Sequence, residues 1–584
     1  MTPIRGHRSA IRFRKIPKIE YRAAGISGGK ISQARTSLLI RDEQLARLAR
    51  ESFDLAIIGG GINGAAISRD AAMRGLNVAL IERGDFAGAT SSRSSKLIHG
   101  GLRYLPQGEL RLVRTALAER ERLRRLTAPH LVKPLKFLFP LYRGRGPGRL
   151  ALGAGLWLYD LFARTPREER HRRLSGAEVL AAEPMLDPVA LKGGAFYYDA
   201  GGDDARLTIE NALDAAYNGA AIANYVELDS FAHAEGKIAA ARIRDRLGGA
   251  PFELRARMFV NAAGPWVDDV RALDDPAALP AVRLTKGVHL VIGRERLPVC
   301  EALVLGDAHD RIVFVIPHGE EVLVGTTDTD FKGDRERVAA EPQDIGYLLD
   351  VVSQSLPGAA ALRAADVAAS FAGLRALAST GTGRAPSSVS REEIIVESGS
   401  GLLSVAGGKL TTHREIAQRI VDRAAAILGR AGGRCPTLDA PLPGARPVAI
   451  EGVDDAAQAL AAMPADLREA MAARYGTRAI IPASLVRESP ELARPLAAGC
   501  PVAAAEVIYA VRYEMALSAA DFIRRRVALS WRHPRYAGAA AVAVARLMAA
   551  ELGWDGAREQ SEIEACSPAP PEMRGAGAAV SSSE

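Results

Sequence analysis

The stretch FDLAIIGGGINGAAISRDAAMRGLNVALIE, residues 53–82, decides the fold of this chain. It opens with the nearly continuous apolar run FDLAII, which is typical of a strand covered on both faces in a parallel sheet. The run AISRDAAMR predicts a helix that is stopped by Gly75, and NVALIE predicts a second strand. Together these segments predict a strand–helix–strand unit with two parallel strands.

The glycine cluster between the first strand and the helix has the spacing GxGxxG at Gly59, Gly61 and Gly64. The pattern is weak alone, but the strand before it, the helix after it and Glu82 at the end of the second strand are the context of a dinucleotide site. Gly59 permits the tight turn, Gly61 lets a pyrophosphate approach, and Gly64 lets the helix pack closely. Glu82 is placed to accept hydrogen bonds from a ribose hydroxyl.

The number of such units indicates which dinucleotide binds. A second glycine pair, Gly153 and Gly155, lacks both a preceding strand and a following acid. An enzyme that used a flavin and a nicotinamide would usually show two complete units, whereas a tightly held flavin needs one. FAD is therefore the favoured cofactor.

Composition and charge narrow the classes of protein. With 584 residues, of which 48% are hydrophobic and 25% charged, the chain is expected to form several globular domains. The net charge of +8 resides in residues 1–36, which hold nine basic residues and one acid, so the remainder is balanced. No nucleic-acid partner is expected, because none of the folded regions shows a basic stripe. Four widely separated cysteines argue against a metal site or a disulfide scaffold.

Residues 1–48 are predicted to be a basic extension that is disordered in part. The extension has no apolar core, so it is not a secretory signal. Three interpretations stay open: a solvated arm, a contact with a membrane surface, and a start codon assigned too far upstream. Its Arg-rich, acid-poor composition also suits a transit peptide, although mitochondrial targeting is the less favoured option.

The remaining chain predicts an α/β fold with three parts. Strand-like runs between 288 and 328 predict an antiparallel sheet, and the Ala-rich region 454–552 has a helical period. We expect a Rossmann-like FAD-binding domain, an antiparallel-sheet substrate cap and a C-terminal α-helical domain. In that order the parts are residues 50–285 with 370–432, residues 286–369, and residues 445–560, followed by a disordered tail at 567–584. The charged segment 110–126 is predicted to be an exposed helix.

The segment LALGAGLWLYDLF, residues 150–162, is the most apolar run, and arginines flank it. It is too short to span a bilayer. Two interpretations stay open: a buried helix, or an interfacial helix with Trp157 and Tyr159 at the level of the lipid headgroups.

The segment GDFAGATSSRSSKLIHGGLRYL, residues 84–105, is too polar for a core and too rich in glycine for a helix. It suits a loop that passes a cofactor. Further motifs follow in the order GDDARL (202–207), VNAAGPWV (260–267), RLTKGVHLV (283–291), RIVFVIPH (311–318), VGTTDTDFKGD (324–334) and GGKLTTHR (407–414). With GGGINGA they closely resemble the FAD-dependent glycerol-3-phosphate dehydrogenases of the aerobic, quinone-linked type.

The resemblance implies oxidation of sn-glycerol 3-phosphate to dihydroxyacetone phosphate, with hydride transfer to FAD and electrons passing to ubiquinone or a similar quinone. It also implies a cytoplasmic protein held peripherally on the inner face of the membrane, and it leaves a homodimer open. An oxidase that uses oxygen, another flavin oxidoreductase of a small anionic substrate, and a non-catalytic flavoprotein remain alternatives.

By the resemblance, Arg103, Arg375 and Lys409 bind the substrate phosphate, because fixed cations suit a phosphate dianion. Tyr104 and Thr411 add hydroxyl donors.

The base is a histidine, since imidazole titrates near neutral pH. His289 is favoured over His99, and His318 and His413 are weaker choices. The predicted catalytic residues are His289 and Arg375.

The predicted cofactor contacts come from the glycine turn, the second strand, the hydroxyl-rich loop and two later glycine motifs. They are Gly59, Gly61, Asn63, Gly64, Glu82, Thr90, Ser91, Ser92, His99, Gly100, Gly101, Gly264, Gly408, Lys409 and Leu410.

Overall fold

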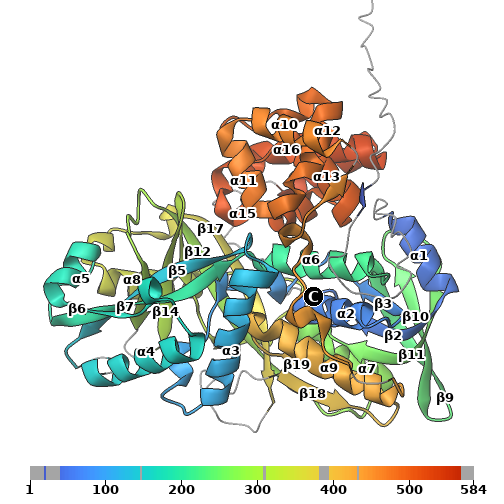
Figure 1. The fold of residues 1–584 in the computed structure, drawn as a ribbon, viewed down its shortest axis with the longest axis horizontal. Coiled ribbons are helices and arrows are strands. Elements are labelled where there is room, and N and C mark those ends of the chain that lie inside the picture. Colours follow the sequence, from blue (N-terminus) through green and yellow to red (C-terminus); the bar gives the residue numbers. More distant parts are fainter. Residues whose placement is uncertain are drawn as a thin grey trace, which may run out of the picture.

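The computed structural model describes residues 19–20, 40–144, 146, 148–306, 311–379, 393–430, 433–450 and 452–566. The predicted disordered tail at 567–584 and most of the predicted extension at 1–48 lie outside the described residues. Figure 1 shows two sheet-containing layers side by side, with a cluster of helices above them. The α/β fold class, with its cap and its C-terminal helical domain, is thereby confirmed.

The first sheet contains the predicted strand–helix–strand unit. Its strands β19 (Leu403–Gly407), β11 (Phe252–Asn261), β2 (Ser52–Ile58), β3 (Val78–Glu82) and β8 (Ala221–Asn224) pair in that order and all run parallel. Antiparallel strands extend it: β18 (Glu393–Glu397) beside β19, β10 (Lys237–Asp245) beside β11, and β9 (Val226–Ala234) beside β10.

Helices cover both faces of the parallel strands, which explains their apolar sequences. One face packs on α2 (Ile62–Met73), α6 (Asp204–Tyr217) and α9 (His413–Ile427). The other carries α1 (Arg41–Arg50) and α7 (Val267–Asp274). The predicted extension therefore reaches too far into the chain: Leu48 of α1 is fully buried, and Arg41 is paired with Asp245 at 2.6 Å.

The second sheet forms the cap. Its order is β16 (Thr329–Asp330), β12 (Val282–Gly293), β15 (Glu321–Gly325), β14 (Ile312–His318), β13 (Ala302–Gly306), β5 (Val132–Tyr142), β7 (Leu191–Gly202) and β4 (Leu97–Ile98). In addition, β17 (Val367–Ala378) pairs with β12, and β6 (Arg172–Ser175) pairs with β7. All pairs are antiparallel except β13 with β5.

The cap differs from the predicted range 286–369. Strands β4, β5, β6 and β7 come from the range assigned to the FAD-binding domain, β12 begins in that range at Val282, and β17 continues to Ala378. The cap is thus assembled from two distant segments, because β5 meets β13 through a parallel pairing that no local sequence signal specifies.

Helices α3 (Leu110–Arg122), α4 (Arg149–Ala163), α5 (Gly176–Ala182) and α8 (Pro342–Ser355) pack on the cap. The prediction that 110–126 is an exposed helix is wrong in part. A π-helical turn at Leu123–Thr127 replaces its last residues, and Val113 and Leu117 are fully buried. Most residues of α3 are polar or charged in sequence, but its apolar residues recur at spacings of three and four. This spacing places them in a narrow stripe on one face of the helix, and that face is buried.

Helix α4, which contains residues 150–162, is buried on one face and exposes apolar residues on the other, so each of the two interpretations holds for part of it. Trp157 is 62% exposed, whereas Tyr159 is 1% exposed and donates a hydrogen bond to Asp199 at 2.8 Å. The interfacial interpretation is therefore wrong for Tyr159, to which the buried interpretation applies. Among the described residues, no helix is both long enough and apolar enough to cross a bilayer.

The C-terminal domain contains α10 (Val453–Ala462), α11 (Ala465–Tyr475), α12 (Ile480–Glu488), α13 (Ala504–Glu514), α14 (Ala519–Asp521), α15 (Leu529–Arg532), α16 (Pro534–Leu552) and α17 (Gly556–Cys566) around its own core. Just before this domain in the chain, β20 (Ala449–Ile450) pairs with the short strand β1 (Ile19–Glu20). Buried ion pairs tie the domain to the rest: Arg526 with Asp85 at 2.6 Å, and Glu514 with Arg206 at 2.7 Å.

Candidate active site

A cavity of about 2090 Å³ is lined by the first sheet, the cap and the hydroxyl-rich loop. Its volume exceeds the roughly 300–1,000 Å³ of a pocket for one small ligand. Every predicted site residue lines it except Gly64, Ser92 and Gly100. Residues far apart in sequence are thus brought to one place, with room for a dinucleotide and a substrate.

The glycine turn lies at one end of the cavity, between β2 and α2. Gly59 has a positive φ of +110°, and a Cβ there would lie 2.6 Å from the carbonyl oxygen of Ala262. A Cβ at Gly64 would overlap the carbonyl oxygen of Gly59, so α2 packs against the turn itself. The first residue of α2, Ile62, donates its N–H to Oγ of Ser91 at 2.9 Å. The turn therefore needs glycine at both positions, as predicted for a dinucleotide cradle.

Glu82 ends β3 beside this turn. Its carboxylate accepts hydrogen bonds from the N–H groups of Gly60 at 2.7 Å and Gly84 at 2.8 Å. Burial raises the pKa of Glu82, and these two N–H groups oppose that rise. The carboxylate is thus fixed at the cavity wall, with lone pairs left for a ribose hydroxyl.

The hydroxyl-rich loop is held mainly by its own side chains. Thr90 donates to the carbonyl oxygen of Leu374 at 2.6 Å, and Ser92 donates to that of Ala89 at 3.4 Å. Ser91 accepts from α2. The three hydroxyls therefore fix the loop between the glycine turn and the cap strand β17; their predicted direct contact with the cofactor stays a prediction.

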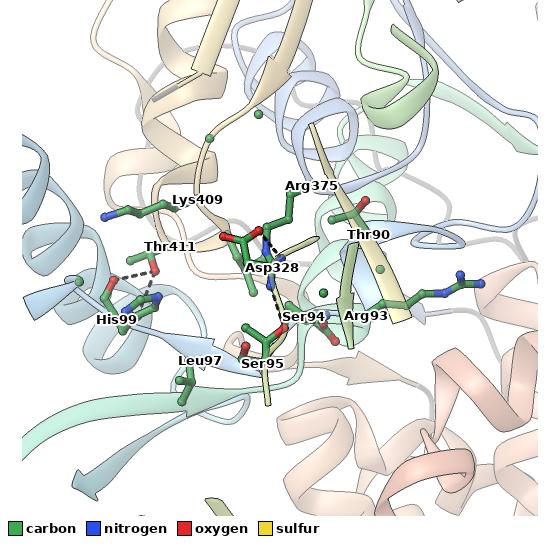
Figure 2. Close-up of a pocket in the computed structure, with 18 of the residues that line it drawn as sticks. Thr90, Arg93, Ser94, Ser95, Leu97, His99, Asp328, Arg375, Lys409 and Thr411 are labelled. Atoms are coloured by element: carbon green, nitrogen blue, oxygen red, sulfur yellow. Dashed lines mark hydrogen bonds and ion pairs between the residues drawn. The ribbon is translucent and has the colours of Figure 1, made fainter. Parts of the chain in front are cut away.

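The predicted phosphate-binding side chains come from two sides of the cavity. Lys409 Nζ lies 3.9 Å from the centre of the Tyr104 ring, and Arg103 donates to the Tyr104 hydroxyl at 2.8 Å. Arg375 donates to Oγ1 of Thr326 at 2.8 Å and to Asp328 at 3.3 Å. Figure 2 shows Lys409 near Thr411 and His99, with Arg375 and Asp328 beside them toward the centre of the view.

His289 lies on β12 and is 2% exposed. Its Nε2 is 2.8 Å from Oγ of Ser95, and its ring stacks on Phe371 with the centres 5.0 Å apart. Burial, followed by the charges of Arg375 and Lys96, holds the pKa of His289 well below its usual value. The imidazole is therefore neutral at physiological pH, with a lone pair on one of its ring nitrogens.

The other histidines are placed differently. The backbone N–H and carbonyl of His99 both bond the Thr411 hydroxyl, at 3.0 and 3.1 Å, so Thr411 braces the loop as well as lining the cavity. Burial lowers the pKa of His318 to about 3 and that of His413 to about 4. Neither is among the described residues that line the cavity.

Sequence reasoning missed Asp328 and Ser95, although both stand inside quoted motifs. Asp328 opposes the positive charge of Arg375, and Ser95 contacts His289. A motif indicates that a region matters, but it does not tell which hydroxyl or carboxylate meets which partner across the fold.

The arrangement fits FAD and a small anion. The glycine turn and Glu82 suit the adenosine and pyrophosphate of the dinucleotide, Gly264 and Gly408 line the same cavity, and the cations lie beyond them. Hydride removal from an alcohol needs an acceptor, a base and fixed positioning. The cavity contains a candidate base and cations that can position the substrate. It also contains the glycine turn, which can hold the cofactor that would serve as acceptor.

Comparisons with known proteins agree with this chemistry. Residues 54–414 match the family described as FAD dependent oxidoreductase, and residues 435–559 match the C-terminal domain of alpha-glycerophosphate oxidase. An aerobic glycerol-3-phosphate dehydrogenase of Staphylococcus haemolyticus is 36% identical over 84% of this chain and 89% of its own length. A glycerol-3-phosphate dehydrogenase of Mycobacterium leprae is 38% identical over 87% of this chain and 86% of its own length. The X-ray structure of the glycerol-3-phosphate dehydrogenase from Bacillus halodurans, complexed with FAD, covers 91% of this chain and 96% of its own chain, at 30% identity and a TM-score of 0.73.

Proposed function

Because the chain belongs to the family of FAD-dependent glycerol-3-phosphate dehydrogenases, we propose that it oxidises sn-glycerol 3-phosphate to dihydroxyacetone phosphate and passes the electrons to a membrane quinone. One observation carries the proposal: a single cavity contains both a dinucleotide cradle and the cations Arg103, Arg375 and Lys409. Three cations exceed what a carboxylate substrate would require, but they suit a phosphate dianion.

The cations hold the phosphate and so fix the rest of the substrate. The guanidinium group of Arg375 lies directly on the backbone of β12 at Gly287. The contact is so close that a Cβ at Gly287 would overlap the guanidinium group. This contact limits the freedom of the side chain, and a planar donor fork binds phosphate oxygens in a defined orientation. Lys409 is buried against Tyr104, so its ammonium group is also held in place.

His289 accepts the hydroxyl proton of the substrate. FAD, when bound, supplies the acceptor for the carbinol hydrogen as hydride. The neutral state of His289 follows from its burial and from two neighbouring cations, which oppose a positive charge on the ring before the substrate dianion arrives. A proton taken up by His289 is then compensated by the two negative charges of the phosphate nearby.

Helix α4 is the proposed contact with the membrane surface. Leu150, Trp157 and Leu161 are 83%, 62% and 55% exposed, and their spacing places them on one face of the helix. Arg149 and Arg164 flank that face and suit anionic headgroups. Residues Ala151, Gly155 and Leu158 of the same helix line the cavity, which supports access for a quinone dissolved in the lipid.

Anaerobic titration of the purified protein with sn-glycerol 3-phosphate tests the reaction. We expect the oxidised-flavin absorbance band to bleach, and then to return on addition of a short-chain ubiquinone faster than on addition of oxygen. A band that the substrate leaves unchanged would contradict the proposed function. Reoxidation by oxygen with stoichiometric peroxide, and none by quinone, would identify an oxidase instead.

Liposome flotation tests the membrane contact. The variant with Trp157→Glu and Leu161→Glu should lose binding to vesicles that contain anionic lipid. The variant Leu279→Glu is the control for an added carboxylate at an exposed leucine, because Leu279 is 81% exposed and lies in the connection between α7 and β12 rather than on α4. Equal flotation of both variants would exclude α4 as the contact.

A further inference from the structure

Ser95 contacts the ring of His289 at the wall of the cavity. Its hydroxyl oxygen lies 2.8 Å from Nε2, and both residues line the cavity. The other ring nitrogen, Nδ1, is shielded from solvent and has no hydrogen-bond partner among the described residues. His289 can therefore exchange a proton with the cavity through Nε2, and Ser95 is its partner at that atom.

The Ser95 hydroxyl is not needed to hold its loop. Ser94 donates to Asp204 Oδ2 at 2.7 Å, and Lys96 donates to Asp204 Oδ1 at 2.7 Å and to the carbonyl oxygen of Ser92 at 2.5 Å. Asp204 is the first residue of α6 and is itself buried. The residues on both sides of Ser95 are thus anchored, which leaves its hydroxyl free for His289.

The surroundings also fix the plane of the His289 ring. Phe371 stacks on it at an interplanar angle of 17°, and the ammonium group of Lys96 lies 5.1 Å from the centre of the same phenyl ring. The imidazole is therefore held between a rigid aromatic neighbour and a hydrogen bond to Ser95. A neutral imidazole has one lone pair, and a serine hydroxyl both donates and accepts.

We propose that Ser95 relays the proton of the substrate hydroxyl to His289, an inference that rests on the role of His289 as base proposed above. As the carbinol hydrogen leaves as hydride, the substrate hydroxyl gives its proton to Oγ of Ser95, and Ser95 gives its own proton to the lone pair on Nε2 of His289, in the tautomer whose Nδ1 carries the ring proton. The substrate carbon–oxygen bond becomes a carbonyl, and the electron pair leaves with the hydride, for which bound FAD would supply the acceptor. Ser95 gains one proton and loses one, and His289 ends as imidazolium.

A double-mutant cycle on flavin reduction tests the relay. The full-length holoprotein is mixed anaerobically with saturating sn-glycerol 3-phosphate, and the rate of bleaching is measured together with the flavin content. Ser95→Ala and His289→Asn should each slow bleaching roughly 10²-fold, the usual contribution of a positioned proton acceptor. The double variant should be no slower than the slower single variant, because both remove the same proton path.

Two further variants separate a relay from a structural role. Ser95→Thr keeps a hydroxyl and should retain most of the wild-type rate. Ser94→Ala weakens the loop anchor at Asp204 without touching His289, so its effect should multiply with that of His289→Asn. If Ser95→Ala loses flavin or fails to fold, Ser95→Thr decides: a folded, flavin-bound but slow threonine variant overturns the relay.

The remaining outcomes are equally distinct. Wild-type bleaching by Ser95→Ala, or losses for Ser95→Ala and His289→Asn that multiply, would overturn the relay and leave the proposed function standing. Wild-type bleaching by His289→Asn would overturn the base and the relay together. A wild-type protein that the substrate does not bleach would overturn the proposed function itself.

Discussion

Replacing Arg375 by alanine is expected to remove most of the preference for a phosphorylated substrate. The Arg375 side chain is 20% exposed and is hydrogen-bonded to Thr326 and Asp328. Truncating one partner of a desolvated charge contact costs on the order of 2–5 kcal/mol. Because Arg375 is partly solvated and Asp328 offsets part of its charge, we expect about 2–3 kcal/mol. That corresponds to a loss of roughly 30- to 150-fold in kcat/KM.

The assay compares kcat/KM for sn-glycerol 3-phosphate with that for glycerol, using an artificial electron acceptor. At a pH above the rise of the rate with pH in both proteins, Arg375→Ala should lower the first value and leave the second unchanged, because glycerol has no phosphate for the guanidinium group to bind. Arg283→Ala is the matched control: Arg283 lies on β12 but is paired with Asp330 at the surface. An unchanged ratio of the two kcat/KM values in Arg375→Ala would refute the role of Arg375 in phosphate binding.

The same variant has a predictable effect on pH dependence. After burial, the charge of Arg375 is the largest cause that lowers the pKa of His289. Removing that charge raises the pKa, and His289 must be neutral to accept a proton. The rise of the flavin-reduction rate with pH should therefore move to higher pH in Arg375→Ala, but not in Arg283→Ala.

Other contacts give three more expected outcomes. Gly64→Ala should abolish flavin retention, measured as the flavin-to-protein absorbance ratio, because a Cβ there would overlap the Gly59 carbonyl oxygen; a full flavin content would contradict this. Arg526→Met deprives the buried carboxylate of Asp85 of two hydrogen bonds, so the free energy of unfolding in urea should fall by about 3 kcal/mol, whereas exposed Arg535→Met should change it little. Burial, and then Glu295, raise the pKa of Glu321 from 4.5 to about 7, so the folded protein keeps a proton that the unfolded chain releases in this range. Stability from this group therefore falls as pH rises from about 5 to 7, and Glu321→Gln should remove that part of the slope of Tm against pH.

The glycine turn and its strands were predictable because the forces that shape them are local. Gly59 needs its positive φ and Gly64 needs the absence of a side chain for reasons that lie within one turn of chain. The apolar runs, or the alternation of apolar and polar residues, in β2, β3, β12 and β14 also indicate directly which of their residues are buried. The cations were found through motif resemblance, and the structure brings them to one cavity.

Pairings between distant segments were not predictable in the same way. Strand β5 joins the cap through β13, and the two lie far apart in the chain, with α4 among the elements between them. Tyr159 resembles an interfacial tyrosine in sequence, yet its hydroxyl bonds Asp199 in the interior. In each case the deciding partner comes from another segment, and a single sequence contains no direct record of that contact.

The C-terminal domain contributes to the surroundings of the active site, although it supplies no predicted site residue. The ring centre of Trp531 in α15 lies 5.2 Å from Nζ of Lys96. The same ammonium group is paired with Asp204. Arg526 contacts Asp85, which follows Glu82 by three residues and thus stands next to the dinucleotide cradle. Both contacts are buried, so the positions of the Ser95–Lys96 loop beside His289 and of the loop after Glu82 depend on the same helical domain. A change that loosens this domain should therefore affect proton transfer and flavin retention together, whereas a change confined to either loop should affect one of them.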